Sequence, residues 1–269
     1  MGRLVVVGTD SSPSSAAAVE LAAAEAQRRG AELRVVYALN WPVRPVYAPL
    51  DTTPLDRVLD EAADRARGVA PGLTVTAAMV PGDTVSVLEA ESRAADLLVL
   101  GARGVGGFLG MLLGSTAASM AAHSRCPVMV AREEPAGPGP VLLCVDGSPA
   151  GAAAVGFAFA EASLRGSEIA AVHAWLPDHA PPGTGVESPE RLLAQALAGH
   201  AERYPDVTVR QEVASGEVRE VLIERSRTAG LVVAGARGRG GFAGLLLGSV
   251  SQALLHHAHS SVVVVRGQA

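Results

Sequence analysis

The sequence predicts an α/β protein with two tandem doubly wound domains, each a five-stranded parallel sheet with helices on both faces. Three observations support this class. Short apolar runs alternate with longer Ala-rich stretches, the alternation occurs twice, and a Pro- and Gly-rich segment separates the two copies. Continuous apolar strands that alternate with helices are typical of a parallel sheet that is covered on both faces.

The first half carries clear boundary signals. Ser12 and Pro13 precede the first helix and Gly30 follows it, which are ordinary start and stop residues. β-branched residues at alternate positions from Val75 favour a strand. Strands are predicted at 4–7, 33–39, 73–80, 97–100 and 128–131, and helices at 14–29, 55–67, 84–93 and 115–123.

The second half gives the same order of elements. It opens on an apolar run that ends at Asp146, as the first half opens on one that ends at Asp10. Strands are predicted at 141–145, 169–174, 207–213, 231–234 and 262–265, and helices at 150–165, 189–204, 218–227 and 249–257.

An internal duplication sets the domain organisation. The segment from Gly101 to Gly104 recurs as the segment from Gly235 to Gly238, and Leu112 to Ser115 recurs as Leu246 to Ser249. A repeat of this length indicates two domains rather than a solenoid, whose repeats span about 20–50 residues. The sequence therefore predicts one domain at 1–134, a linker at 135–140 and a second domain at 141–269.

The composition excludes several classes of protein. Acidic residues outnumber basic ones by 27 to 22, which argues against nucleic acid as a partner because a nucleic-acid-binding face must neutralise phosphates. All the basic residues are Arg, so the chain has no Lys for a Walker A loop, a protein kinase or a Schiff base.

Cellular location and thiol chemistry are also constrained. The chain starts without a charged leader and long apolar stretch, and no apolar run reaches the roughly 18 residues of a membrane span. A cytoplasmic protein without a membrane partner is therefore expected. Two cysteines, Cys126 and Cys144, are too few for a disulfide framework, and we expect both to be buried and inert.

The Gly-rich loops after the fourth strand of each half are the predicted ligand sites. In open parallel sheets, ligands bind beyond the carboxyl ends of the strands, where strand order reverses. Each loop opens a helix, whose N-terminus attracts anions, and Ser115 and Ser249 stand where an N-cap is expected. Arg103, Arg237 and Arg239 add positive charge, so the residues describe a phosphate-binding loop without Lys.

Two other interpretations of these motifs are weaker. The spacing from Gly238 to Ala243 fits a dinucleotide fingerprint, but it follows a fourth strand rather than a first, and Leu109 breaks it in the first half. The histidines at 256, 257 and 259 are expected to stabilise a helix C-terminus rather than to hold a metal.

Each half resembles a universal stress protein domain of the ATP-binding type. That family's fingerprint is Gly, two residues, Gly, nine residues, Gly and then Ser or Thr. The chain matches it from Gly101 to Ser115 and again from Gly235 to Ser249. The opening Asp-Gly-Ser of the family is intact at Asp146 and has Ser in place of Gly after Asp10. Its closing His-x-x-Cys-Pro-Val occurs at 123–128, and the second half departs from it. The tandem arrangement is similar to that of actinobacterial members.

This resemblance implies a Rossmann-like (adenine nucleotide alpha hydrolase-like) fold and two ATP molecules per chain, with Mg²⁺ accompanying the phosphates. The first-strand Asp would contact adenine, the second-strand end would line its pocket, and the Gly loop would wrap the ribose and phosphates. The implied residues of the first half are Gly8, Asp10, Ala38, Gly101, Ala102, Arg103, Gly104, Gly106, Gly107, Gly114, Ser115 and Thr116. Those of the second half are Cys144, Asp146, Ala174, Gly235, Ala236, Arg237, Gly238, Gly240, Gly241, Gly248, Ser249 and Val250.

Two functions follow from these residues. The first is an ATP-binding, non-catalytic regulator of a stress response, which acts through conformation or a protein partner. The second is a slow ATPase or another adenine-nucleotide enzyme of the same fold class, for which no residue that positions a water is apparent. The apolar closing strands at 128–131 and 262–265 are expected to pair the two halves within one chain, and whole chains could then pair as a homodimer.

Overall fold

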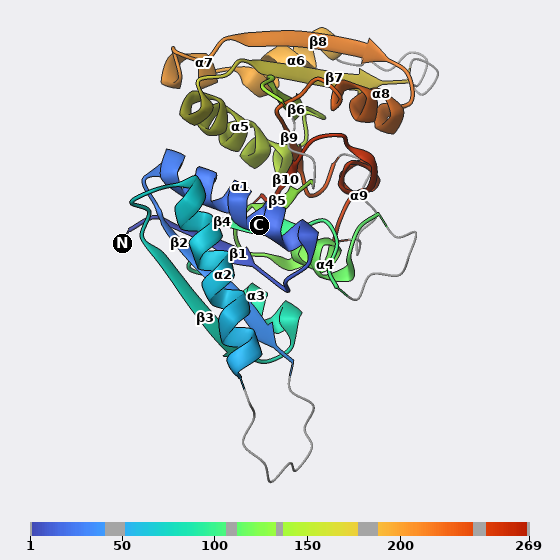
Figure 1. The fold of residues 1–269 in the computed structure, drawn as a ribbon. Helices are drawn as coiled ribbons and strands as arrows, with labels where there is room; N and C mark the ends of the chain where they lie inside the picture. Colours follow the sequence, from blue (N-terminus) through green and yellow to red (C-terminus); the bar gives the residue numbers. More distant parts are fainter. Residues whose placement is uncertain are drawn as a thin grey trace. The chain divides into compact units, whose positions relative to one another are not determined.

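The computed structural model describes residues 2–40, 52–105, 112–132, 137–176, 188–238 and 246–267. The chain divides into two compact units, Met1–Glu133 and Glu134–Ala269. Figure 1 traces the alternation of strands and helices along each unit. In the described ranges, no helix is both long enough and apolar enough to cross a membrane.

Unit 1 alternates strands and helices throughout. Its strands are β1 (Leu4–Gly8), β2 (Glu32–Leu39), β3 (Val75–Pro81), β4 (Leu97–Gly101) and β5 (Val128–Ala131). Its helices are α1 (Pro13–Arg29), α2 (Thr53–Val69), α3 (Thr84–Glu91) and α4 (Ser115–His123).

Unit 2 has the same order of strands. Its strands are β6 (Val141–Cys144), β7 (Ile169–Trp175), β8 (Val209–Ser215), β9 (Leu231–Gly235) and β10 (Val262–Val265). A 3₁₀ turn, Pro149–Gly151, precedes α5 (Ala152–Arg165), and the other helices are α6 (Pro189–Leu197), α7 (His200–Arg203), α8 (Val218–Arg225) and α9 (Ser249–His257). Unit 2 differs from unit 1 in this 3₁₀ turn before its first helix and in having two helices, α6 and α7, where unit 1 has α2.

Both units have the same parallel topology. Within unit 1 the strand order is β3-β2-β1-β4-β5, with Val5 opposite Leu33 of β2 and Leu97 of β4. Within unit 2 the order is β8-β7-β6-β9-β10. Helices α1 and α2 cover one face of the first sheet and α3 and α4 the other, and α5 and α6 face α8 and α9 across the second. The predicted α/β class, with five parallel strands in each half, is confirmed.

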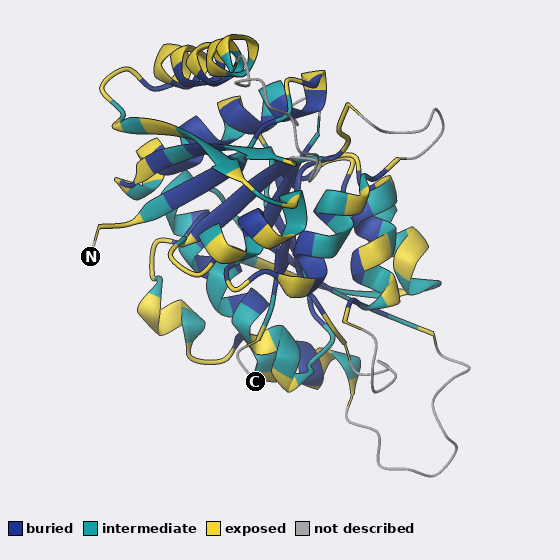
Figure 2. Cartoon of the chain, turned by 90° about the horizontal axis from the view of Figure 1, so that it is seen from below, coloured by how far each residue is buried: buried dark blue, intermediate teal, exposed yellow. Residues whose placement is uncertain are grey.

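The strands and the inner sides of the helices form the core. Val5, Val6 and Val7 of β1 are 0% exposed. Figure 2 shows buried inner strands and exposed outer sides of the helices. Strands β3 and β8, which lie at the ends of the strand orders given above, have no buried residue. Helix α1 buries Ala18 and Ala22 completely. Such small side chains allow the axis of α1 to approach β1 and β4 closely, which brings the start of α1 near the carboxyl ends of these strands.

The predicted helix at 189–204 is wrong in its length, because it is two helices. Gly199 lies between α6 and α7 with φ of 77°, a left-handed conformation that ends the helix. The predicted strand starts at Leu73 and Val207 are also early. The N–H of Leu73 donates to the carbonyl of Ala70, and that of Val207 to the carbonyl of Tyr204. These turns delay each strand by two residues.

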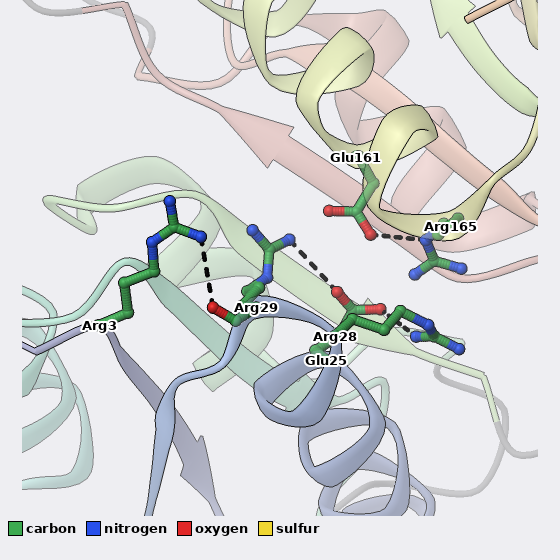
Figure 3. Close-up of polar contacts among 6 residues, drawn as sticks. All are labelled: Arg3, Glu25, Arg28, Arg29, Glu161 and Arg165. Carbon is green, nitrogen blue, oxygen red and sulfur yellow. Dashed lines mark hydrogen bonds and ion pairs between the residues drawn. The ribbon is translucent and has the colours of Figure 1, made fainter. Parts of the chain in front are cut away.

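Buried ion pairs occupy corresponding places in α1 and α5 (Figure 3). On α1, the Glu25 carboxylate lies 2.7 Å from an Nη atom of Arg28 and 3.2 Å from one of Arg29. On α5, Glu161 pairs with Arg165. Both Glu side chains are 0% exposed, so each negative charge depends on its Arg partners for the interactions that water would otherwise supply.

We expect Glu25→Ala to lower the free energy of unfolding by about 3 kcal/mol, because it removes a fully buried carboxylate that pairs with both Arg28 and Arg29. Glu20→Ala is the matched control on the same helix. Its ion pair with Arg65 is about half exposed, and its loss should cost less than about 1 kcal/mol. Urea unfolding followed by circular dichroism measures both, and equal losses would contradict the ranking.

Candidate functional site

A cavity of about 460 Å³ lies where the strand order of unit 1 reverses, between the carboxyl ends of β1 and β4. This volume falls within the range of roughly 300–1,000 Å³ that is usual for small-molecule sites. The cavity is lined by Gly8, Thr9, Asp10, Ser15, Val36, Ala38, Thr84, Leu88, Leu100, Gly101, Arg103, Gly104, Leu113, Gly114, Ser115, Thr116 and Ala117.

The Asp10 carboxylate connects the loops that follow β1 and β4. Its Oδ1 accepts a hydrogen bond from the N–H of Ser12 at 3.0 Å, and its Oδ2 accepts one from the N–H of Val105 at 2.9 Å. A Cβ on Gly104 would lie 2.5 Å from Asp10 Oδ2, closer than a carbon atom tolerates. Only glycine therefore allows the loop to pass this close to the carboxylate.

Serine hydroxyls at the start of α1 hold the same loop. The N–H of Arg103 donates to Ser14 Oγ at 3.1 Å, and Ser12 Oγ donates to the carbonyl of Arg103 at 3.3 Å. The hydroxyls of Thr9 and Ser15 lie 3.3 Å apart beneath them. The sequence predicted a helix start here but not the contacts of these serines with Arg103. The position of the serines directly after Asp10 is the feature of the sequence that could have indicated a role in the site.

The N-terminus of α4 opens onto the cavity. Its N-cap is Gly114, whose N–H donates to the carbonyl of Ala102 at 2.7 Å, so the predicted N-cap role of Ser115 is wrong by one residue. The same correction applies to Ser249, since Gly248 caps α9. No side chain caps either helix, which leaves the N–H groups of the first turn available to an anion.

Positive charge gathers beside this helix end. Arg103 lines the cavity, and Arg132 follows β5. Burial, and then the positive charge of Arg103, lowers the pKa of Arg132 from its ordinary value. Of these two residues only Arg103 lines the cavity, and its positive charge favours an anion there. We name the combination of Asp10, Arg103, Gly104 and the segment 114–116 the cradle of unit 1.

Unit 2 contains the same backbone frame. A Cβ on Gly238 would lie 2.6 Å from Asp146 Oδ2, and the N–H of Gly248 donates to the carbonyl of Ala236 at 2.8 Å. Asp146 Oδ1 accepts from both the N–H and the hydroxyl of Ser148. We name Asp146, Arg237, Gly238 and the segment 248–250 the cradle of unit 2.

The cavity described in unit 2 has a different lining. It measures about 310 Å³ and lies between the end of β6 and helices α5 and α6. Its lining residues are Cys144, Val145, Asp146, Gly147, Ser148, Pro149, Gly151, Ala152, Val155, Leu192, Gln195 and Ala196.

Most of the predicted residues of unit 1 lie together around its cavity. Those are Gly8, Asp10, Ala38, Gly101, Arg103, Gly104, Gly114, Ser115 and Thr116, whereas Ala102 is buried outside the lining. In unit 2, Cys144 and Asp146 line the described cavity; Ala174, Gly235, Ala236, Arg237, Gly238, Gly248, Ser249 and Val250 do not. The predictions at Gly106, Gly107, Gly240 and Gly241 lie outside the described residues.

The apolar walls of the first cavity were missed. Val36 comes from β2, Leu88 from α3, and Leu100 from β4. Thr84, at the start of α3, was also not predicted. In the sequence these residues resemble ordinary core or helix-start positions. The sheet places Val36 and Leu100 at the cavity, and the packing of α3 beside α4 places Thr84 and Leu88 there.

Neither the cysteines nor acidic clusters provide a catalytic or metal centre in the described residues. Cys126 is buried as predicted, but Cys144 is only partly buried and lines the cavity of unit 2, so the prediction that both are buried is wrong for Cys144. Desolvation is the main cause that raises the pKa of Cys126 to about 11 and that of Cys144 to about 12. Both thiols are therefore protonated at neutral pH. The described part of the chain also contains no group of three or more His, Cys, Asp or Glu side chains that could hold a metal ion.

The fold and its loops define a duplicated, doubly wound α/β protein with a cavity at the strand-order reversal of its first unit. The model of the universal stress protein family matches residues 1–132 and 139–266, and the chain belongs to that family.

Relatives from several organisms support this assignment. A universal stress protein of Mycobacterium tuberculosis is 35% identical, and one of Mycolicibacterium smegmatis is 37% identical. Each match covers 97% of this chain and 96% of the relative. Among solved structures, a universal stress protein from Archaeoglobus fulgidus has the same fold, with a TM-score of 0.75, 19% identity and coverage of 98% of both chains.

Native protein at pH 8 should react with dithionitrobenzoate far more slowly than denatured protein, in which both thiols react. The thiolate is the reactive form, and burial holds the pKa of each thiol well above this pH. Because folding raises these pKa values, the thiols contribute to stability at neutral pH, and that contribution is lost as pH rises through about 11–12. Rapid labelling of either thiol in folded protein would contradict the burial.

Proposed function

We propose that this protein is an ATP-binding regulator of a stress response that works without strong catalysis. The observation that carries the proposal is the cavity of unit 1, in which apolar walls and an uncapped helix N-terminus meet at one strand-order reversal. The resemblance of both Gly loops to the ATP-binding fingerprint supports ATP as the nucleotide.

The two ends of the cavity suit the two ends of ATP. Val36, Ala38 and Leu88 offer apolar contacts to a purine ring, and Asp10 offers an acceptor to its amino group. At the other end, Ser115 and Thr116 stand at the first turn of α4, where N–H groups suit phosphate oxygens.

Mg²⁺ would enter with the triphosphate. The described residues offer no acidic cluster for the ion, so phosphate oxygens and water would supply most of its ligands. The frame around Asp146 and Gly238 in unit 2 supports a second nucleotide per chain.

Binding is favoured over turnover because the first cavity lacks an evident base among its described residues. Asp10 is its acidic lining residue, and both oxygens of its carboxylate already accept backbone N–H groups. Phosphoryl transfer needs a group that positions the attacking water, as well as charge neutralisation. We therefore expect the bound nucleotide to act through conformation and a protein partner.

Purified protein should release an adenine nucleotide on denaturation, and mass spectrometry of the released small molecules tests this. Sustained phosphate release from ATP would instead support the ATPase alternative. Absence of ATP binding in calorimetric titration with ATP and Mg²⁺ would refute the proposal.

Asp10→Ala should raise the Kd for ATP about tenfold, since it removes the acceptor that holds Val105 and the one offered to adenine. Preference for ATP over GTP should fall as well. Calorimetric titration with both nucleotides measures this, and Asp64→Ala, an exposed carboxylate on α2, is the control. Weaker binding with unchanged preference would show that Asp10 anchors the loop without reading the base.

A further inference from the structure

We propose that the two cradles of one chain are unequal: the cradle of unit 1 binds ATP tightly, and the cradle of unit 2 binds it weakly. This inference rests on the proposed function and adds an order of occupation to it. It follows from a comparison of corresponding residues in the two units.

The backbone frames of the two cradles are nearly the same. The carboxylate of the first strand lies against a loop glycine in both, with separations of 2.5 Å and 2.6 Å from a Cβ added to Gly104 or Gly238. Helices α4 and α9 begin identically, because Gly114 and Gly248 donate to corresponding carbonyls at 2.7 Å and 2.8 Å. Among the described residues of the two cradles, the main differences lie in the side chains.

Hydroxyl groups distinguish the two units. The described lining of the unit 1 cavity carries five hydroxyls, at Thr9, Ser15, Thr84, Ser115 and Thr116. Four of the corresponding residues in unit 2 have no hydroxyl, and only Ser249 keeps one. The exchanges, in order, are Thr9 to Val145, Ser15 to Gly151, Thr84 to Val218 and Thr116 to Val250.

The anchoring of the loop differs in the same direction. In unit 1, Ser14 Oγ accepts the N–H of Arg103. The corresponding residue of unit 2 is Ala150, which has no side-chain acceptor for the N–H of Arg237. Unit 2 has a different anchor, since Ser251 Oγ donates to the carbonyl of Gly235 at 2.6 Å where unit 1 has Ala117. The N–H of Arg103 is thus held by a side-chain contact that unit 2 lacks, and preorganisation of this kind increases affinity.

The floor of the site also differs. In unit 1, Gly8 ends the first strand, and a Cβ there would lie 2.8 Å from Leu100 Cδ2 and 3.3 Å from Leu88 Cδ2. In unit 2, Cys144 stands in place of Gly8 and Ala234 in place of Leu100. Cys144 thus places a thiol side chain at the strand end where unit 1 has only backbone.

The expected consequence is stepwise occupation. A nucleotide oxygen that meets Val in place of Thr loses a hydrogen bond, and several such losses should weaken the second cradle by about tenfold or more. One ATP per chain would bind at low concentration and a second at high concentration. The cradle of unit 1 would then be occupied at nearly all ATP concentrations, and the occupancy of the cradle of unit 2 would change with the ATP concentration.

Full-length protein titrated with ATP and Mg²⁺ tests this, with calorimetry for affinity and native mass spectrometry for the number of ligands per chain. Wild-type protein should show a tight and a weak phase. Gly104→Ala should remove the tight phase and Gly238→Ala the weak one. The two substitutions are matched, because each places a Cβ against the corresponding Asp carboxylate.

A hydroxyl exchange provides a second test with near-isosteric side chains. Val218→Thr with Val250→Thr should tighten the weak phase, and Thr84→Val with Thr116→Val should weaken the tight one. Each of the four residues is of intermediate exposure, so the fold should tolerate the changes. Circular dichroism of each variant checks that it is folded.

Each result has one meaning. Two phases assigned as above support the inequality. Two equal sites, or a tight phase that Gly238→Ala removes, would overturn it and leave ATP binding intact. No binding of ATP by the wild-type protein would overturn the proposed function together with this inference.

Discussion

The close contact between a carboxylate and a glycine backbone organises each unit. Asp10 lies in the loop after β1, and its Oδ2 accepts a hydrogen bond from the N–H of Val105, next to Gly104. This bond joins the carboxyl ends of two neighbouring strands, β1 and β4, from which the connections of the sheet run in opposite directions. The cavity exists because these connections diverge, and the Asp10 bond fixes the loop that forms its rim.

Helix α1 transmits the packing of the core to this contact. Its fully buried alanines let it lie close to β1 and β4, and its first turn then reaches the loop. The N–H of Arg103 bonds to Ser14, and Ser12 bonds to the carbonyl of the same residue. At its other end, Glu25 is held by Arg28 and Arg29. Substitutions in the core of α1 should therefore alter the site as well as stability.

The sequence predicted the fold well because apolar periodicity and terminal Gly and Pro residues determine where strands and helices lie. The prediction of helix length failed at Gly199, where a single left-handed φ angle ends the helix. The amphipathic pattern of the sequence continues across this residue and so does not show the break. It also misplaced the N-cap at Ser115. The bond from Gly114 to the carbonyl of Ala102 ends the loop one residue earlier, and the sequence carries no sign of that bond.

The polar half of the first site was predictable and its apolar half was not. Spaced glycines with an Asp and a Ser form a pattern that few core segments share. Leu88 and Leu100 are indistinguishable in sequence from other buried leucines, and only the packing of α3 against the sheet makes them cavity walls.

The two units also show which parts of a duplicated site can drift. A Cβ at Gly104 or Gly238 would overlap a carboxylate oxygen, so a substitution there disrupts the loop entirely, and both glycines are present. A hydroxyl contributes a single hydrogen bond, and its loss weakens binding by degrees. Thr9, Ser15, Thr84 and Thr116 could therefore be exchanged in the other copy without loss of the fold. Loss of such graded contacts from one copy of a duplicated site would lower its affinity while the backbone frame of the loop is kept.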